Sequence, residues 1–247
     1  MIALIVLFLA ALWAGAQNAL AGGGSFITLP SLMFTGMDAR AANITSTVAL
    51  FPAQIVTGLT GRAGAQGAEG LSLKTLFVIS LIGGGIGGAI LLLTPPSFFA
   101  RLVPWLVLFA TALFGWGSFL RKQPKPGETS LPPWGAGLAQ FFIAVYGGYF
   151  GGGIGILMLA ALTAAGMAVR NAGATKNMLA SMSGATSVLI FVIETRFDWR
   201  MVLYFAVAAI AGGQLGVYLL RRINDRLLCI GITAIGIALT IGLFLRS

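Results

Sequence analysis

Long apolar stretches run through the 247 residues of this chain, and short polar or glycine-rich segments separate them. They occupy residues 1–21, 41–60, 72–94, 98–120, 131–150, 171–194, 199–220 and 226–245. A helix needs about 20 predominantly apolar residues to cross the hydrocarbon core of a bilayer. The strands of a membrane β-barrel alternate over only about 10 residues, so this pattern predicts membrane-spanning α-helices.

Two shorter apolar pieces, residues 25–36 and 154–166, each follow a glycine triplet. At 1.5 Å per residue such a piece is only about 18–20 Å long, whereas the hydrocarbon core is about 30 Å thick. We predict that each is a glycine-broken half-helix or re-entrant segment. The expected fold class is an all-α integral membrane protein with eight to ten membrane segments.

The chain repeats itself at an offset of 130 residues. Residues 36–47 read GMDARAANITST and residues 166–177 read GMAVRNAGATKN, and the glycine triplet at 22–24 corresponds to the one at 151–153 with one residue of slippage. A duplicated membrane unit is typical of secondary transporters. We therefore predict two homologous membrane repeats, residues 1–120 and 131–247, joined by a polar linker at 121–130.

The distribution of basic residues predicts the orientation of the repeats. If the two short pieces reverse the chain, one side collects Arg62, Lys74, Arg121, Lys122, Lys125, Arg170, Lys176, Arg221, Arg222 and Arg226, and the other collects Arg40, Arg101, Arg196, Arg200 and Arg246. Basic residues concentrate on the cytoplasmic side of membrane proteins. This arrangement gives each repeat an odd number of segments, inverts one repeat relative to the other, places the linker in the cytoplasm and both termini outside.

Composition agrees with a lipid environment and argues against an enzyme. Hydrophobic residues make up 58% of the chain and charged residues 9%, whereas a soluble domain is about 25% charged. The net charge of +9 comes largely from residues in the connections, so it does not predict nucleic-acid binding. The chain has no histidine and one cysteine, Cys229, and we therefore expect no metal site, no cofactor and no catalytic residues.

The glycine triplets are candidate anion-binding elements. A helix that begins just after Gly22, Gly23 and Gly24, at Ser25, and one that begins after Gly151, Gly152 and Gly153 would direct unpaired N–H groups at the space before them. Helix N-termini bind anions, and two such starts could face each other near the midplane. The alternative is close helix packing, for which glycine is also favoured.

Charged and polar side chains follow each short piece. Arg40 and Arg170 would lie deep if that piece ends inside the membrane, where an anionic substrate would offset their cost; alternatively they extend to the headgroups. Nearby hydrogen-bonding residues either line a pathway or bridge helices, and they are Asn43, Thr45, Ser46, Thr47, Asn171, Thr175, Lys176, Asn177, Ser181 and Ser183. Asp38 and Glu194 are the acids close enough to apolar sequence to suggest proton coupling.

These features together resemble the TauE/SafE family of sulfite-exporter-type permeases, also called the 4-toluene sulfonate uptake family. The resemblance is carried by the glycine break at 22–25, by Gly36-Met37 with Arg40, by residues 43–46, and by their counterparts in the second half. It implies a carrier of the bacterial inner membrane, without an ATPase, for sulfite, organosulfonates or related anions.

The sequence thus predicts a multi-pass secondary transporter that moves a small oxyanion, either sulfite or an organosulfonate, by alternating access. Its expected partners are the anion, the bilayer and a coupling ion, either a proton or sodium. The predicted binding residues are Gly22, Gly23, Gly24, Ser25, Arg40, Asn43, Thr45, Gly151, Gly152, Gly153, Arg170, Asn171, Thr175 and Asn177. A passive anion channel and a membrane enzyme or assembly factor are the alternatives.

Overall fold

The computed structural model describes residues 2–20, 22–68, 70–116, 119, 131–219 and 225–245. Within these residues the chain is helical, and the only β structure is an isolated bridge between Ala68 and Leu71. The first half contains α1 (Ile2–Leu20), α2 (Ser25–Met33), α3 (Ala39–Gly61), the 3-10 helix η1 (Arg62–Gly64), α4 (Leu73–Leu93) and α5 (Pro96–Gly115). The second half contains α6 (Pro133–Tyr149), α7 (Ile154–Ala164), α8 (Val169–Glu194), α9 (Trp199–Leu219) and α10 (Asp225–Phe244).

The all-α prediction is confirmed, and the two short apolar pieces are separate helices. α2 has 9 residues and α7 has 11, and they begin at the predicted residues, Ser25 and Ile154. Each is followed by a glycine with positive φ, Gly36 at 92° and Gly166 at 80°. This left-handed conformation suits glycine and ends each short helix before the long helix that follows.

Several helices carry the length and composition of membrane spans. Among the described residues, four stretches meet both criteria: Ala39–Gly64, Leu73–Leu93, Pro96–Leu113 and Arg170–Glu194. Large apolar side chains are exposed on the outside of the helices, for example on α6 and α9. An apolar outer surface is suited to contact with lipid chains, so the protein is a membrane protein.

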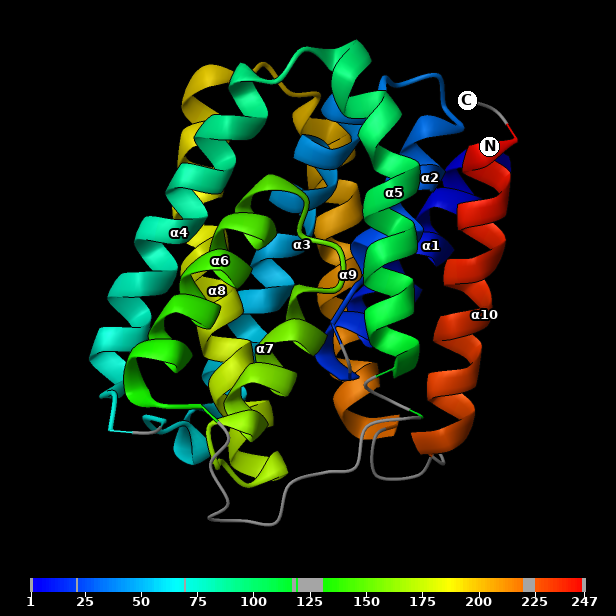
Figure 1. Cartoon of the computed structure of the whole chain (residues 1–247). Coiled ribbons are helices and arrows are strands. Elements are labelled where there is room, and N and C mark those ends of the chain that lie inside the picture. The colour runs from blue at the N-terminus through cyan, green and yellow to red at the C-terminus, as the bar shows by residue number, and fades with distance from the viewer. Residues whose placement is uncertain are drawn as a thin grey trace.

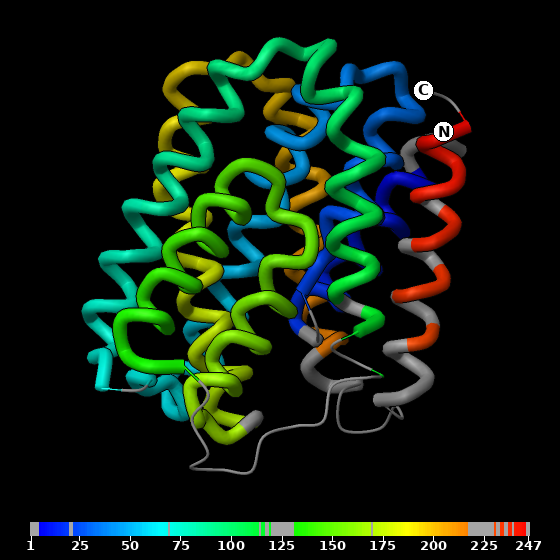
Figure 2. The backbone as a smooth tube through the Cα atoms, viewed as in Figure 1, coloured from blue at the N-terminus to red at the C-terminus, as the bar shows by residue number. Residues whose placement is uncertain are grey.

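The short helices reverse the direction of the chain (Figures 1 and 2). In the view of Figure 1, α1 descends from the end near the N-terminus, α2 returns toward that end, and α3 descends again. In the second half α6 rises from the opposite end, α7 turns back, and α8 rises past it. The N- and C-terminal ends lie close together at one end of the helix bundle.

The helices of the two halves are interleaved. α1 packs along α9, α4 packs along α6, and α3 lies against α8. When the halves are matched by the repeat, α1 corresponds to α6 and α4 to α9, so the first two contacts are counterparts. In each of these three pairs one helix comes from the first half and the other from the second, so the halves form a shared core.

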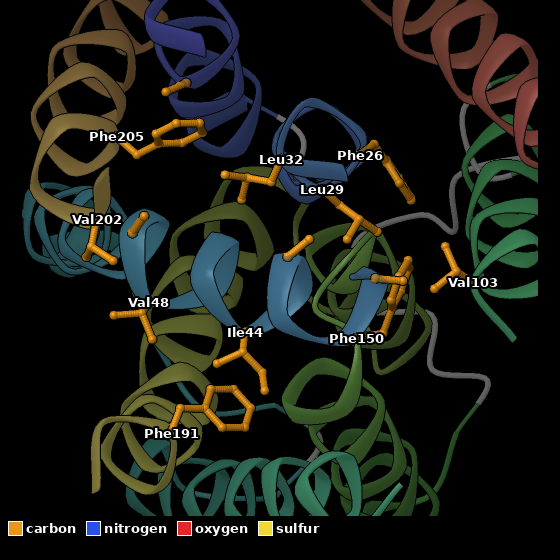
Figure 3. Close-up of a cluster of buried hydrophobic side chains, with 14 of the residues drawn as sticks. Phe26, Leu29, Leu32, Ile44, Val48, Val103, Phe150, Phe191, Val202 and Phe205 are labelled. Atoms are coloured by element: carbon orange, nitrogen blue, oxygen red, sulfur yellow. The ribbon is translucent and has the colours of Figure 1, made fainter. Parts of the chain in front are cut away.

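The largest core cluster surrounds α3 (Figure 3). Val48 of α3 points toward Val202 of α9, and Ile44 points toward Phe191 of α8. On the other side of α3, Leu29 of α2 lies near Phe150, which is 1% exposed. This packing holds α2 against α3, and α1 packs against α2 as well.

Glycines allow α4 and α6 to touch through their backbones. A Cβ atom added to Gly87 would lie 2.0 Å from the Val145 carbonyl oxygen, and one added to Gly148 would lie 2.1 Å from that of Gly84. On the corresponding contact of α1 with α9, a Cβ at Gly212 would lie 1.8 Å from the Leu12 oxygen. The glycines at 83–88 therefore include positions at which α4 packs directly against the backbone of α6.

Hydroxyl groups on α8 hydrogen bond to neighbouring helices. Ser187 Oγ donates to the Gly84 carbonyl at 2.8 Å, and Ser183 Oγ donates to that of Ala144 at 3.1 Å. Ser181 Oγ donates to the Gln54 carbonyl at 2.9 Å. Ser181 and Ser183 thus bridge helices, which is one of the two roles expected from the sequence.

Replacing Gly87 by Ala is expected to lower the stability of the protein. The added methyl would overlap the Val145 carbonyl and force α4 from α6, and overpacking of this kind costs about 1–3 kcal/mol. Gly85→Ala is the matched control, because its Cβ would lie 3.6 Å from Thr186 Cβ, an ordinary contact. Thermal unfolding of both variants in detergent checks the prediction, and equal unfolding temperatures would contradict it.

Candidate functional site

The two glycine breaks lie against each other in the structure. A Cβ atom added to Gly22 would be 2.9 Å from the Cα atom of Gly155, at the start of α7. One added to Gly151 would be 3.6 Å from Ser25 Oγ, at the start of α2. The N-terminal ends of the two short helices, which are 129 residues apart in sequence, are therefore neighbours.

A small cavity lies at this junction, between α1, α3, α7 and α8. It has about 340 Å³ of empty space, a volume that includes the open solvent at its mouth. Its lining consists of Asn18, Gly22, Gln54, Thr57, Ile154, Gly155, Lys176, Asn177 and Ala180. Both halves of the chain contribute to the cavity.

Lys176 supplies the charge in this lining. It lies in α8, well inside the helix, and is 3% exposed. The structure gives it neither an ion pair nor a hydrogen bond within the described part of the chain, and none of the cavity-lining residues is acidic. A charge inside a membrane protein is expensive unless it is paired, so this lysine makes the cavity the candidate functional site.

Asn18 also lines this cavity, and its side chain carries an unpaired donor. Its Oδ1 atom accepts a hydrogen bond of 2.9 Å from the backbone N–H of Gly24, next to the start of α2. Its Nδ2 atom is buried and has no hydrogen-bond partner. A buried donor without a partner costs free energy, and an acceptor bound in the cavity would recover it.

The N-terminal end of α7 opens into the cavity as well. Gly153, with φ of 77°, precedes the helix, and the first hydrogen bonds within it are donated by Ile156 and Leu157 to the Gly153 carbonyl. The earlier N–H groups, those of Ile154 and Gly155, belong to residues that line the cavity. The positive end of the helix dipole therefore adds to the charge of Lys176.

The remaining polar groups of the lining are one hydroxyl and two amides. Thr57 Oγ1 donates to the Ala53 carbonyl at 2.8 Å, so this hydroxyl offers no donor to the cavity. Asn177 and Gln54 each add an amide group. The lining thus combines one cation, amide donors and a helix N-terminus without an acid, which is the chemistry that binds a small anion.

Comparison with known proteins identifies the family of this chain. Residues 7–243 match the family model described as sulfite exporter TauE/SafE. The chain belongs to the TauE/SafE family. The resemblance found in the short glycine-rich motifs is thereby confirmed over nearly the whole chain.

Curated relatives of this TauE/SafE protein carry transporter names. The "Probable membrane transporter protein" of Haemophilus influenzae is 25% identical over 217 residues, which cover 86% of this chain and 83% of the relative. The "Probable membrane transporter protein YfcA" of Escherichia coli K12 is 25% identical over 233 residues, 90% of this chain and 82% of the relative. The "Probable membrane transporter protein ORF9" of a Sinorhizobium species is 26% identical over 220 residues, covering 86% and 81%. Family and relatives together indicate a membrane transporter.

Arg40, predicted from the sequence to bind the anion, lies away from the cavity lining of this TauE/SafE protein. Its Nη1 atom donates to the carbonyls of Leu92 at 3.1 Å and Thr94 at 2.9 Å, at the end of α4. A cation is favourable at a helix C-terminus, so Arg40 ties the start of α3 to α4. Its direct role in binding stays a prediction.

The other predicted charged residues lie at helix ends. Asp38 is exposed and caps α3, accepting hydrogen bonds from the backbone N–H groups of Arg40 and Ala41. Arg170 is exposed in the first turn of α8, and Glu194 is exposed at its last residue. None of these side chains lines the cavity.

Three predicted polar residues are buried near the helix breaks. Asn43 is 1% exposed and its Nδ2 atom donates to the Tyr149 carbonyl at 3.1 Å, at the end of α6. Thr175 is fully buried, and its hydroxyl exchanges hydrogen bonds with both backbone groups of Gln66. Thr45 is buried in α3. Asn43 and Thr175 thus hold neighbouring chain segments in place, while Asn171 is half-buried in the first turn of α8.

Of the predicted binding residues, Gly22 and Asn177 line the cavity directly. Ser25 and Gly151 lie side by side next to it, Gly23 and Gly24 precede α2, and Gly152 and Gly153 precede α7. The sequence placed Lys176 in the polar cluster of the 171–194 stretch and counted it among the basic residues of one side of the membrane, and the structure has it inside α8. A lysine within an apolar helical stretch was the available signal.

The lining residues Asn18, Gln54 and Thr57 were missed altogether. Each is a single amide or hydroxyl in an otherwise apolar helix, a pattern shared by residues that only bridge helices. Among the described residues, no group of three His, Cys, Asp or Glu side chains is placed to hold a metal ion.

The structure predicts different effects for the two repeat-related arginines. Arg40→Ala removes two hydrogen bonds from a charged donor, each worth about 1.5–3 kcal/mol, so the unfolding temperature should fall. Arg170→Ala removes an exposed side chain and should change stability by less than about 0.5 kcal/mol. Thermal unfolding of both purified variants checks this, and an unchanged Arg40→Ala protein would contradict the assignment.

Proposed function

We propose that this protein is a secondary transporter for a small oxyanion, either sulfite or an organosulfonate, and that the anion binds beside Lys176. The observation that carries the proposal is the enclosed Lys176, which shares its cavity with an unpaired Asn18 Nδ2 donor and the open N-terminus of α7. Removing an oxyanion from water requires replacement of its hydration by donors and positive charge.

The choice of a sulfur oxyanion is supported by the donors and by the family. Sulfite and sulfonate groups present three acceptor oxygens, and the ammonium, the amides and the helix N-terminus approach the cavity from different elements. The family to which the chain belongs is described by sulfite export. A carboxylate presents two oxygens and would use fewer of these donors.

Alternating access in this proposal comes from two inverted repeats that move relative to each other. The paired contacts of α1 with α9 and α4 with α6, and the opposite courses of the two halves in Figure 1, support such a relation. Inverted repeats whose broken helices meet at the substrate are common in secondary transporters. The cavity lies between α3 of one repeat and α8 of the other, so relative motion would expose it to each side in turn.

The protein would cross the bacterial inner membrane several times. The four long apolar helices support this, and the remaining long helices lie parallel to them in Figure 1. The distribution of basic residues favours a cytoplasmic linker and external termini. In this arrangement the glycine breaks lie near the midplane, at the depth where carriers bind their substrates.

Lys176→Gln is expected to abolish anion binding. The change removes the one charge of the lining, and loss of a buried charge partner costs about 2–5 kcal/mol, or roughly 30-fold or more in affinity. Thermal-shift titrations of the purified protein with sulfite, thiosulfate, methanesulfonate, sulfate and acetate measure the effect. Lys74→Gln is the matched control, because Lys74 is exposed in the first turn of α4.

Asn18→Asp tests the unpaired donor without disturbing the start of α2. The aspartate keeps an oxygen for the Gly24 N–H, but it replaces the Nδ2 donor by a second oxygen and adds negative charge. We expect normal folding and no stabilisation by sulfur oxyanions. If acetate alone stabilised the wild-type protein, the assignment of a sulfur oxyanion as substrate would be wrong. If Lys176→Gln and Asn18→Asp both bound the anion as the wild type does, the cavity would not be the binding site.

A further inference from the structure

The enclosure of Lys176 has a consequence for how the anion is moved. An ammonium surrounded by protein without a counter-charge is costly, so an enclosed lysine either has an anion beside it or gives up its proton. The side chain is 3% exposed, and the cavity lining offers it no carboxylate. The occupancy of the cavity and the protonation of Lys176 are therefore linked.

No second group in the lining is suited to take over this proton. The titratable side chains on the elements packed around the cavity sit elsewhere: Asp38 and Arg40 at the start of α3, Arg62 in η1, Lys74 in α4, Tyr146 and Tyr149 in α6, and Arg170 and Glu194 at the ends of α8. Arg40 is bonded to two carbonyls, and the Tyr146 hydroxyl donates to the Gly152 carbonyl. α1 and α7 carry no ionisable side chain.

We propose that Lys176 couples the movement of one proton to each monovalent anion, which makes transport electroneutral. This inference rests on the proposed function. When the anion enters, the Lys176 amine takes a proton from water through its nitrogen lone pair, and the ammonium–anion pair has no net charge. When the anion leaves on the other side, the new N–H bond breaks and the proton returns to water.

The empty carrier then returns with a neutral amine. The cavity thus has no net charge from Lys176 and the anion, whether it is occupied or empty. Neither change of access therefore has the energetic cost of moving an uncompensated ion through the low-dielectric interior. Asp38 and Glu194, the coupling candidates of the sequence, are exposed at helix ends and are not needed for this cycle. Arginine cannot lose its proton in a protein, so Lys176→Arg should keep the charge and lose the coupling.

Proteoliposomes containing the full chain and an internal pH-sensitive dye test the coupling. The probe is labelled methanesulfonate, whose acid is ionised throughout the working range, so any proton that enters is moved by the protein. We expect uptake with internal acidification, at the same rate at zero and at inside-negative membrane potential set with potassium and valinomycin. Labelled sulfite is run in parallel as a second probe of anion uptake.

The variants separate this inference from the proposed function. Lys176→Arg should take up the anion without acidification and in a potential-dependent way, whereas Lys74→Arg should behave as the wild type. Wild-type uptake that carries charge without protons would overturn the coupling and leave the transporter intact. No wild-type uptake of either anion would overturn both, and the wild-type measurement decides the matter even if Lys176→Arg does not fold.

Discussion

A helix that begins inside an apolar environment leaves its first backbone N–H groups without partners, and no water is there to satisfy them. α2 begins at Ser25 and α7 at Ile154, and the groups near these two helix starts differ. In the first half the Asn18 side chain accepts from Gly24. In the second half a glycine, Gly147, stands at the position of Asn18, four residues before the triplet, and no side chain caps the start of α7.

The same difference separates the long helices that follow. Lys176 in α8 corresponds in the repeat to Ser46 in α3, and Ser46 is hydrogen bonded to Thr28 within the first half. At these two positions the first half pairs its groups, Gly24 with Asn18 and Ser46 with Thr28, while the second half has an open helix end and the enclosed cation Lys176.

Much of the fold could be predicted because it depends on features that are local in sequence. Apolar length predicts the long helices, and glycine triplets followed by short apolar runs predict the starts at Ser25 and Ile154. The site was less predictable, because Asn18 of α1 and Lys176 of α8 are far apart in sequence and line the same cavity only in the folded protein. Arg40 shows the opposite case. Its motif predicted a residue that binds the anion, whereas its side chain donates to carbonyls 52 and 54 residues away, and such distant contacts cannot be read from the sequence.

The most direct test of the anion site is a crystal structure of the protein grown with selenite, an oxyanion of the same shape as sulfite, with diffraction measured at the selenium edge. We expect one anomalous peak in the cavity, within hydrogen-bonding distance of Lys176 Nζ and Asn18 Nδ2. A peak beside Arg40 or Arg170, with the cavity free of selenium, would contradict it.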